Sequence, residues 1–208
     1  MEEKEIRDEL ASIRSLMERS SKFISLSGLS GVLAGVYALI GAGIAYILLQ
    51  NNPVSGRLSF FEVWSNAVNL LFSLITITLV VLIASIATAF ILSSRKAKRR
   101  GQPVWSAASK SLLFHMSVPL VTGGIFIAIL FYQGYDAFII PAMLLFYGLS
   151  LVSASNFTFS DVKYLGLLQI ALGLIAACIP QFGLLFWALG FGVLHIVYGS
   201  IMYFKYDK

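Results

Sequence analysis

Residues 164–204, YLGLLQIALGLIAACIPQFGLLFWALGFGVLHIVYGSIMYF, contain no charged side chain. The stretch is about twice the ~20 apolar residues that a helix needs to cross a bilayer. Ile179-Pro180-Gln181-Phe182-Gly183 interrupts it near the middle, and proline and glycine this close together favour a tight turn. The stretch therefore predicts a hairpin of two membrane-spanning helices.

Four further uncharged stretches are long enough for one span each: 23–56, 63–94, 111–135 and 137–160. The composition agrees, because 58% of the residues are hydrophobic and 12% charged, whereas soluble domains carry about 25% charged residues. We expect an all-α polytopic membrane protein of six spans, arranged as three hairpins. The expected spans are 24–50, 66–92, 112–132, 138–155, 164–179 and 184–204.

The N-terminal segment, residues 1–22, carries charges throughout and has an apolar stripe at helical spacing. The stripe consists of Ile6, Leu10, Ile13, Met17 and Ile24. It predicts an amphipathic cytoplasmic helix ahead of a transmembrane bundle of residues 23–208. Its apolar face could pack on the membrane surface, on the bundle, or on a second copy of the chain.

The basic residues predict the orientation of the spans. With six spans, only Arg57 among the 15 Lys and Arg residues falls on one side of the membrane. Loops rich in Lys and Arg remain in the cytoplasm. We therefore expect both termini in the cytoplasm and the chain in a bacterial inner membrane.

One loop carries the densest run of basic residues. Its members are Arg95, Lys96, Lys98, Arg99 and Arg100. They could bind anionic lipid headgroups, at ~1 kcal/mol per basic residue, or serve only to set the topology. The net charge of +5 requires no nucleic-acid partner.

Small residues recur at spacings that allow close approach of helix backbones. Those expected to pack helices together are Gly31, Gly35, Gly173, Gly192 and Gly199. Packing within one chain is the first interpretation, and a homodimer through the Gly31–Gly35 stripe is the alternative. An internal repeat is also indicated, because Gly28, Gly35 and Ala38 are spaced like Gly166, Gly173 and Ala176.

Four polar side chains lie inside the expected spans, near their cytoplasmic ends: Ser30, His115, Gln169 and His195. Polar groups in a bilayer usually face the bundle interior or a wet cavity. One hypothesis is a shared polar pocket in the inner-leaflet half. The other is that each side chain bonds a backbone carbonyl of a neighbouring helix.

These residues bear on several kinds of chemistry. Two histidines on different helices can ligate a haem, although no cofactor is expected. Gly28-Leu29-Ser30-Gly31 with His195 resembles the serine and histidine of rhomboid proteases, but their serine lies on a later span. The single cysteine, Cys178, excludes an internal disulfide and a multi-cysteine metal site. The absence of acids and lysines inside the spans disfavours proton-coupled transport.

The C-terminal hairpin resembles a known family. Its Gly166-Leu-Leu-Gln-Ile-Ala-Leu-Gly173, Pro180-Gln-Phe-Gly183, Gly192 and Tyr198-Gly199 resemble the glycine-punctuated hairpins of the HdeD-type acid-resistance membrane proteins. The resemblance implies six spans and a stress-related role, and supplies no catalytic residues. The leading expectation is a non-enzymatic stress-related or regulatory membrane component. The alternatives are a small-molecule channel or transporter, and a membrane haem protein or enzyme.

Overall fold

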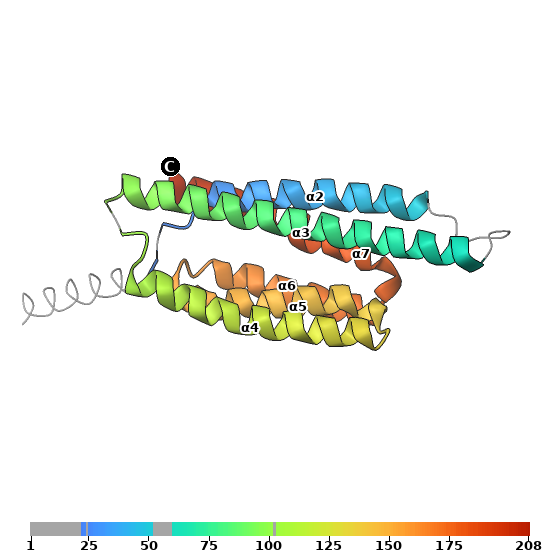
Figure 1. The fold of residues 1–208 in the computed structure, drawn as a ribbon. Helices are drawn as coiled ribbons and strands as arrows, with labels where there is room; N and C mark the ends of the chain where they lie inside the picture. The colour runs from blue at the N-terminus through green and yellow to red at the C-terminus, as the bar shows by residue number, and fades with distance from the viewer. Residues whose placement is uncertain (1–21, 24, 52–59, 102) are drawn as a thin grey trace, which may run out of the picture. The chain divides into compact units, whose positions relative to one another are not determined.

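The computed structural model describes residues 22–23, 25–51, 60–101 and 103–208, and the regular elements of these ranges are all helical (Figure 1). The principal helices are α2 (Gly28–Gln50), α3 (Phe60–Arg99), α4 (Ala107–Tyr132), α5 (Ile139–Ala154) and α6 (Val162–Cys178). The all-α prediction is confirmed for this part of the chain. The amphipathic helix predicted for 1–22 lies outside the described residues, except for Lys22.

A continuous helical stretch, Pro180–Asp207, ends the chain and is called the C-terminal helix below. It begins with the 3₁₀ turn η3, so the predicted break between the last two spans is a short turn. Its segments are η3 (Pro180–Phe182), α7 (Gly183–Trp187), the π-helical η4 (Ala188–Leu194), α8 (His195–Met202) and the π-helical η5 (Tyr203–Asp207).

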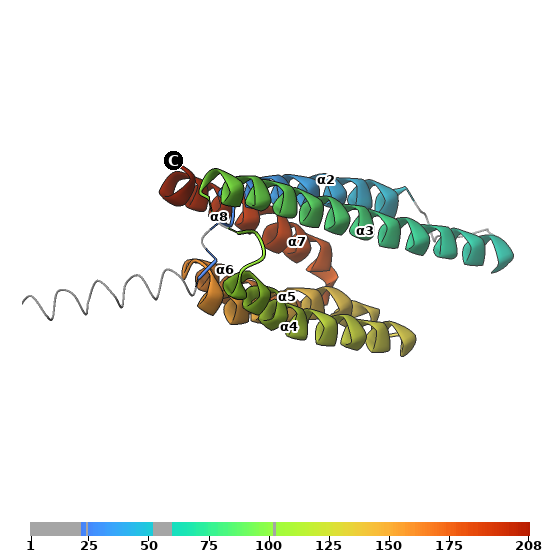
Figure 2. The same ribbon diagram turned by 60° about the vertical axis from the view of Figure 1, so that its left-hand side comes forward.

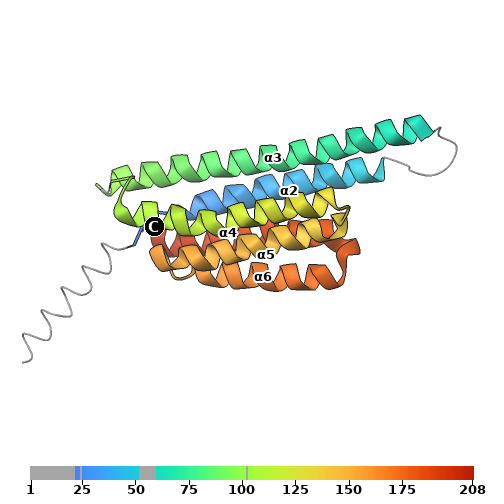
Figure 3. The ribbon, with the colours of Figure 1, turned by 60° about the horizontal axis from the view of Figure 1, so that its bottom comes forward.

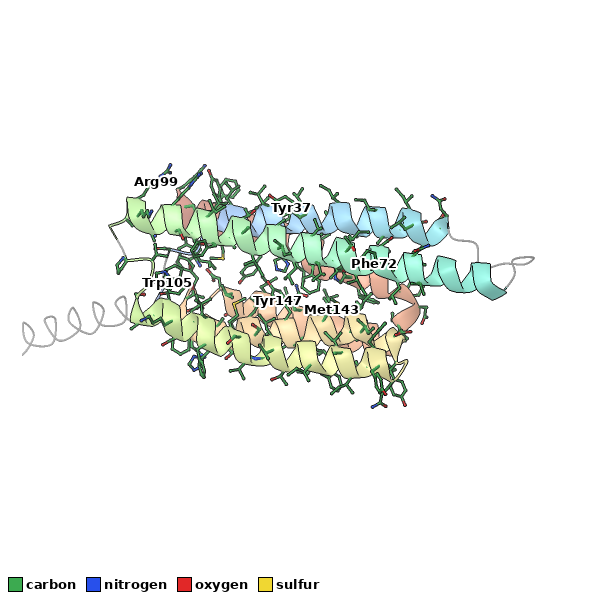
Figure 4. All side chains as sticks on the ribbon, in the orientation of Figure 1. Tyr37, Phe72, Arg99, Trp105, Met143 and Tyr147 are labelled. Atoms are coloured by element: carbon green, nitrogen blue, oxygen red, sulfur yellow. The ribbon has the colours of Figure 1, made fainter. Side chains whose placement is uncertain are left out.

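Five helices of the described chain are long and apolar enough to cross a membrane. They are α2, residues Val68–Arg99 of α3, α4, the stretch Asp136–Phe157 around α5, and the C-terminal helix. The remaining expected span, 164–179, corresponds to α6, which is apolar but has only 17 residues. Large apolar side chains cover the outside of these helices. Phe72 of α3, labelled in Figure 4, is 71% exposed, and such a surface suits lipid rather than water.

The described chain divides into two compact units. Of the described residues, the first contains 22–23, 25–26 and Ser94–Pro180, and the second contains those within Ser27–Ser93 and Gln181–Lys208. The boundary falls inside α3, whose last turns belong to the first unit. The expectation of one bundle over residues 23–208 stays a prediction.

In the first unit, α5 packs against both α4 and α6, and the three helices run side by side (Figure 3). The α5–α6 contact is backbone to backbone. A Cβ added to Gly148 would lie 2.7 Å from the carbonyl oxygen of Gly166, and one added to Gly166 would lie 2.8 Å from that of Gly148. On the other side of α5, the Ser150 hydroxyl donates to the Met116 carbonyl of α4 at 2.9 Å.

In the second unit, α2 packs against the C-terminal helix and runs beside α3 (Figure 2). The first contact is again backbone to backbone. A Cβ on Gly35 would lie 2.6 Å from the Gly192 carbonyl oxygen, and one on Gly199 would lie 2.8 Å from the Gly28 carbonyl oxygen. Gly31 lies on the same contact, since its Cβ would be 3.2 Å from the Gly199 Cα. A dimer through Gly31 and Gly35 would therefore have to displace the C-terminal helix.

Candidate functional site

Ser30 lies in the first turns of α2 and is buried. Its hydroxyl donates to the Ser27 carbonyl at 2.6 Å. A nucleophilic serine instead needs its proton directed at a general base. The geometry of Ser30 thus suits a hydroxyl satisfied within the first turn of its own helix better than the serine of a protease.

His195 begins α8, directly after the π-helical segment η4. Its Nδ1 lies 2.9 Å from the Gly190 carbonyl oxygen, five residues earlier, and its ring stacks on Phe191 with centroids 6.0 Å apart. Because a carbonyl can only accept, Nδ1 carries the proton of this hydrogen bond. π-helical turns inside α-helices are frequent at functional sites, so His195 remains a candidate functional residue.

His115 lies near the start of α4 and is half-buried. Its Nδ1 lies 2.8 Å from the Ser111 carbonyl oxygen of its own helix, and its ring lies 4.3 Å from that of Phe157. As in His195, Nδ1 carries the proton of this hydrogen bond. In both cases the carbonyl belongs to the histidine's own helix, whereas the sequence hypothesis placed it on a neighbouring helix.

Gln169 is fully buried in α6. It lies three residues after Gly166 and four before Gly173, so it shares the face of α6 that packs on α5. A buried amide requires hydrogen-bonding partners, and removing them is costly. Gln169 therefore contributes a polar element to the α5–α6 contact.

The four candidate polar residues divide equally between the two units. His115 and Gln169 belong to the first unit, and Ser30 and His195 belong to the second. The shared pocket stays a prediction. In the part of the chain that the structure describes, no group of three or more His, Cys, Asp or Glu residues could hold a metal ion.

The basic run at the end of α3 is not uniform. Lys96 turns inward, where its Nζ donates to the Leu26 carbonyl at 2.7 Å and lies 5.4 Å from the Phe159 ring centroid. The remaining members of the run are exposed: Arg95, Lys98, Arg99 and Arg100. One of the five expected headgroup contacts thus has an internal structural role.

Two sets of hydrogen bonds, one at the start of α2 and one at Phe23, have no counterpart in the sequence predictions. Asp207 accepts hydrogen bonds from the Gly28 backbone N–H at 2.9 Å and from the Ser27 hydroxyl at 3.2 Å. It therefore places a carboxylate at the N-terminus of α2, where the helix dipole favours negative charge. In the first unit, the backbone N–H of Phe23 donates to the Phe157 carbonyl at 2.8 Å, and the Phe23 carbonyl accepts from the Thr158 hydroxyl at 2.8 Å.

A shallow apolar groove of about 260 Å³ lies between α2 and α3. Its two hydroxyl-bearing residues are Tyr37, whose hydroxyl lies 3.4 Å from that of Thr88, and Thr76, which donates to Phe72 at 2.8 Å. The groove offers almost no polar surface to a ligand. Its lining consists of Tyr37, Ile40, Gly41, Ile44, Thr76, Ile77, Val80, Val81 and Ala84.

Comparison with protein-family models, with characterised proteins and with solved structures finds no match to the chain.

Proposed function

We propose that the chain is a six-span integral protein of a bacterial inner membrane that acts as a non-enzymatic, stress-related or regulatory component through its cytoplasmic face. The five long apolar helices support the membrane location. For α6, 17 residues correspond to about 25 Å of helix, close to the ~30 Å hydrocarbon core. The close α5–α6 contact also favours counting α6 as a span.

The observation that carries the non-enzymatic part is how the polar groups inside the spans are bonded. Nine of their side chains bond carbonyls three to five residues earlier in the chain, which satisfies them locally, whereas Ser150 bonds the Met116 carbonyl of α4 and Tyr37 lies beside Thr88 of α3. The nine residues bonded locally are Ser30, Ser73, Thr76, Thr78, His115, Ser117, Thr122, His195 and Ser200. This arrangement supports a structural or regulatory component more than a channel or a haem protein.

The stress-related role is proposed because residues 166–199 resemble the hairpins of HdeD-type proteins. The basic residues add the orientation, because only Arg57 of the 15 Lys and Arg residues falls on the outer side of a six-span arrangement. The cytoplasmic face then contains both termini and the loop after α3.

Topology reporters test the membrane arrangement. A reporter fused after Lys208 should indicate the cytoplasm, and one inserted near Pro53 should indicate the opposite side. A C-terminus outside the cytoplasm would contradict six spans.

Reconstitution tests the non-enzymatic part. Purified protein in vesicles should show the same small-solute flux as protein-free vesicles, and no visible absorption band. Protein-dependent flux would establish the channel or transporter alternative, and a haem band would establish the membrane haem protein.

A genetic experiment tests the stress-related part. A strain without the gene should lose acid tolerance, and the wild-type gene should restore it.

A further inference from the structure

The last turns of α3 present three exposed cations on one side, Arg95, Lys98 and Arg99, here called the basic face. We propose that the basic face binds the headgroup of an anionic phospholipid. This inference rests on the proposed membrane location and gives the cytoplasmic face a ligand class. The ligand chemistry is a phosphate monoanion, and the position of the face assigns it to the bilayer rather than to a soluble phosphate.

The spacing of these residues places their side chains together. Residues three and four apart lie on the same side of a helix, so Lys98 and Arg99 both neighbour Arg95. The opposite side of this segment is packed, because Ala97 is fully buried and Lys96 donates inward to Leu26. The packed side therefore fixes the direction in which the basic face points.

The charges of the basic face are not compensated within the described chain. The side chains of Arg95, Lys98 and Arg99 make no hydrogen bond or ion pair with any residue that the structure describes. Like charges at these spacings repel each other, and the negative end of the α3 dipole offsets only part of that repulsion. An external anion would relieve the remainder. Arginine also matches phosphate oxygens with two parallel N–H donors.

The position of the basic face along α3 favours a lipid as the source of that anion. The uncharged stretch 63–94 ends at the residue before Arg95, so the face begins where the helix leaves the hydrocarbon. Gly101, with φ +64°, ends the helix. Trp105 follows in the connection to α4 and is 62% exposed, as expected of an aromatic side chain at headgroup depth. Figure 4 labels Arg99 at the end of α3 and Trp105 in the connection.

The test measures lipid retention by the full chain in neutral detergent. Protein is equilibrated with equal amounts of phosphatidylglycerol and phosphatidylcholine, and bound lipids are quantified by native mass spectrometry. The wild type should retain phosphatidylglycerol preferentially. The triple variant Arg95→Gln, Lys98→Gln, Arg99→Gln should bind it about a hundredfold more weakly, from ~1 kcal/mol per basic residue. Phosphatidylcholine retention should not change.

A control variant separates a specific site from general charge. Lys163→Gln, Lys205→Gln, Lys208→Gln removes the same number of positive charges at other positions, and should keep the preference within a fewfold of wild type. An equal loss in both variants would overturn the site. Displacement of phosphatidylglycerol by inorganic phosphate at the same concentration would overturn the lipid source.

A topology reporter on the triple variant distinguishes this inference from the proposed function. Unchanged lipid preference with unchanged topology would overturn the lipid site and leave the membrane arrangement intact. Unchanged lipid preference with inverted topology would show that these residues only orient the chain.

Discussion

The two backbone-to-backbone helix contacts noted above, in the part of the chain that the structure describes, follow the same pattern. A Cβ on Gly28 would lie 2.7 Å from the Gly199 carbonyl oxygen, and a Cβ on Gly166 would lie 2.8 Å from the Gly148 carbonyl oxygen. One heptad further on, a Cβ on Gly35 would lie 2.9 Å from the Ile196 backbone nitrogen. Its counterpart on Gly173 would lie 3.0 Å from the Leu145 backbone nitrogen. The intervals along the chain are the same in each case, so α2 corresponds to α6 and the C-terminal helix corresponds to α5.

The correspondence shows that connectivity does not determine this contact. Helices α5 and α6 follow one another directly, whereas α2 and the C-terminal helix lie at opposite ends of the described chain. Small residues at heptad spacing suffice, because they let two backbones approach closely. The two contacts differ where α2 has Gly31 and α6, at the corresponding position, has the buried Gln169.

The strongest test replaces one glycine in each contact. Gly35→Leu and Gly166→Leu should each cost about 3 kcal/mol of stability, because a large side chain would push the paired backbones apart. Thermal unfolding of the purified protein in detergent measures the effect. The matched controls Gly43→Leu and Gly124→Leu, where an added Cβ meets nothing within 4 Å, should leave the unfolding midpoint unchanged. A large loss in only one contact would break the correspondence between the pairs.

The difference between the pairs is tested at Gln169. Gln169→Ala should cost about 2 kcal/mol, because it removes packed atoms from a fully buried position in the α5–α6 contact. Gln181→Ala is the control, since Gln181 is exposed, and should shift the same unfolding midpoint by little. If the two variants unfolded alike, Gln169 would contribute nothing that distinguishes the α5–α6 contact.

The N-termini of the corresponding helices differ as well. Asp207 accepts from Gly28 at the start of α2, whereas Asp161 at the start of α6 makes no side-chain capping bond. Asp207→Ala should therefore destabilise the second unit by about 1.5 kcal/mol, as for loss of a helix cap. Hydrogen exchange of the first amides of α2 reports the loss locally. Asp136→Ala, at an exposed position, should leave those amides unchanged, and equal exchange in both variants would refute the capping role.

The smallest expected effect concerns Lys96 against its neighbour Lys98. Lys96→Met keeps the aliphatic stem but removes the bond to Leu26, and should cost about 1 kcal/mol or less. Lys98→Met should cost nothing, because Lys98 is exposed. Thermal unfolding of both variants measures the two losses of stability. A larger loss in Lys98→Met than in Lys96→Met would show that the bond from Lys96 to Leu26 does not stabilise the fold.

The helices were predictable because charge is excluded from long stretches of the sequence. Each expected span falls on a helix, and the interruption at 179–183 contains the turn η3. The repeat of Gly28 and Gly35 in Gly166 and Gly173 was predictable from the sequence, because their seven-residue spacing can be read without knowing which helix each pair packs against. The contacts of the candidate site were harder to predict from the sequence. Asp207 and Ser27 are 180 residues apart, and no local pattern shows that Lys96 turns inward or that residues 188–194 form a π-helix.

The unequal lengths of the helices have a consequence for the surrounding membrane. At ~1.5 Å per residue, the uncharged residues 63–94 of α3 extend about 48 Å and the 17 residues of α6 about 25 Å. A bilayer adapts to a long apolar helix by thickening or by letting the helix tilt, and to a short one by thinning. In the six-span arrangement, α3 and α6 would therefore impose opposite hydrophobic mismatches on their annular lipids. The energy of such a protein depends on local bilayer thickness, which sorts it among membranes of different lipid composition.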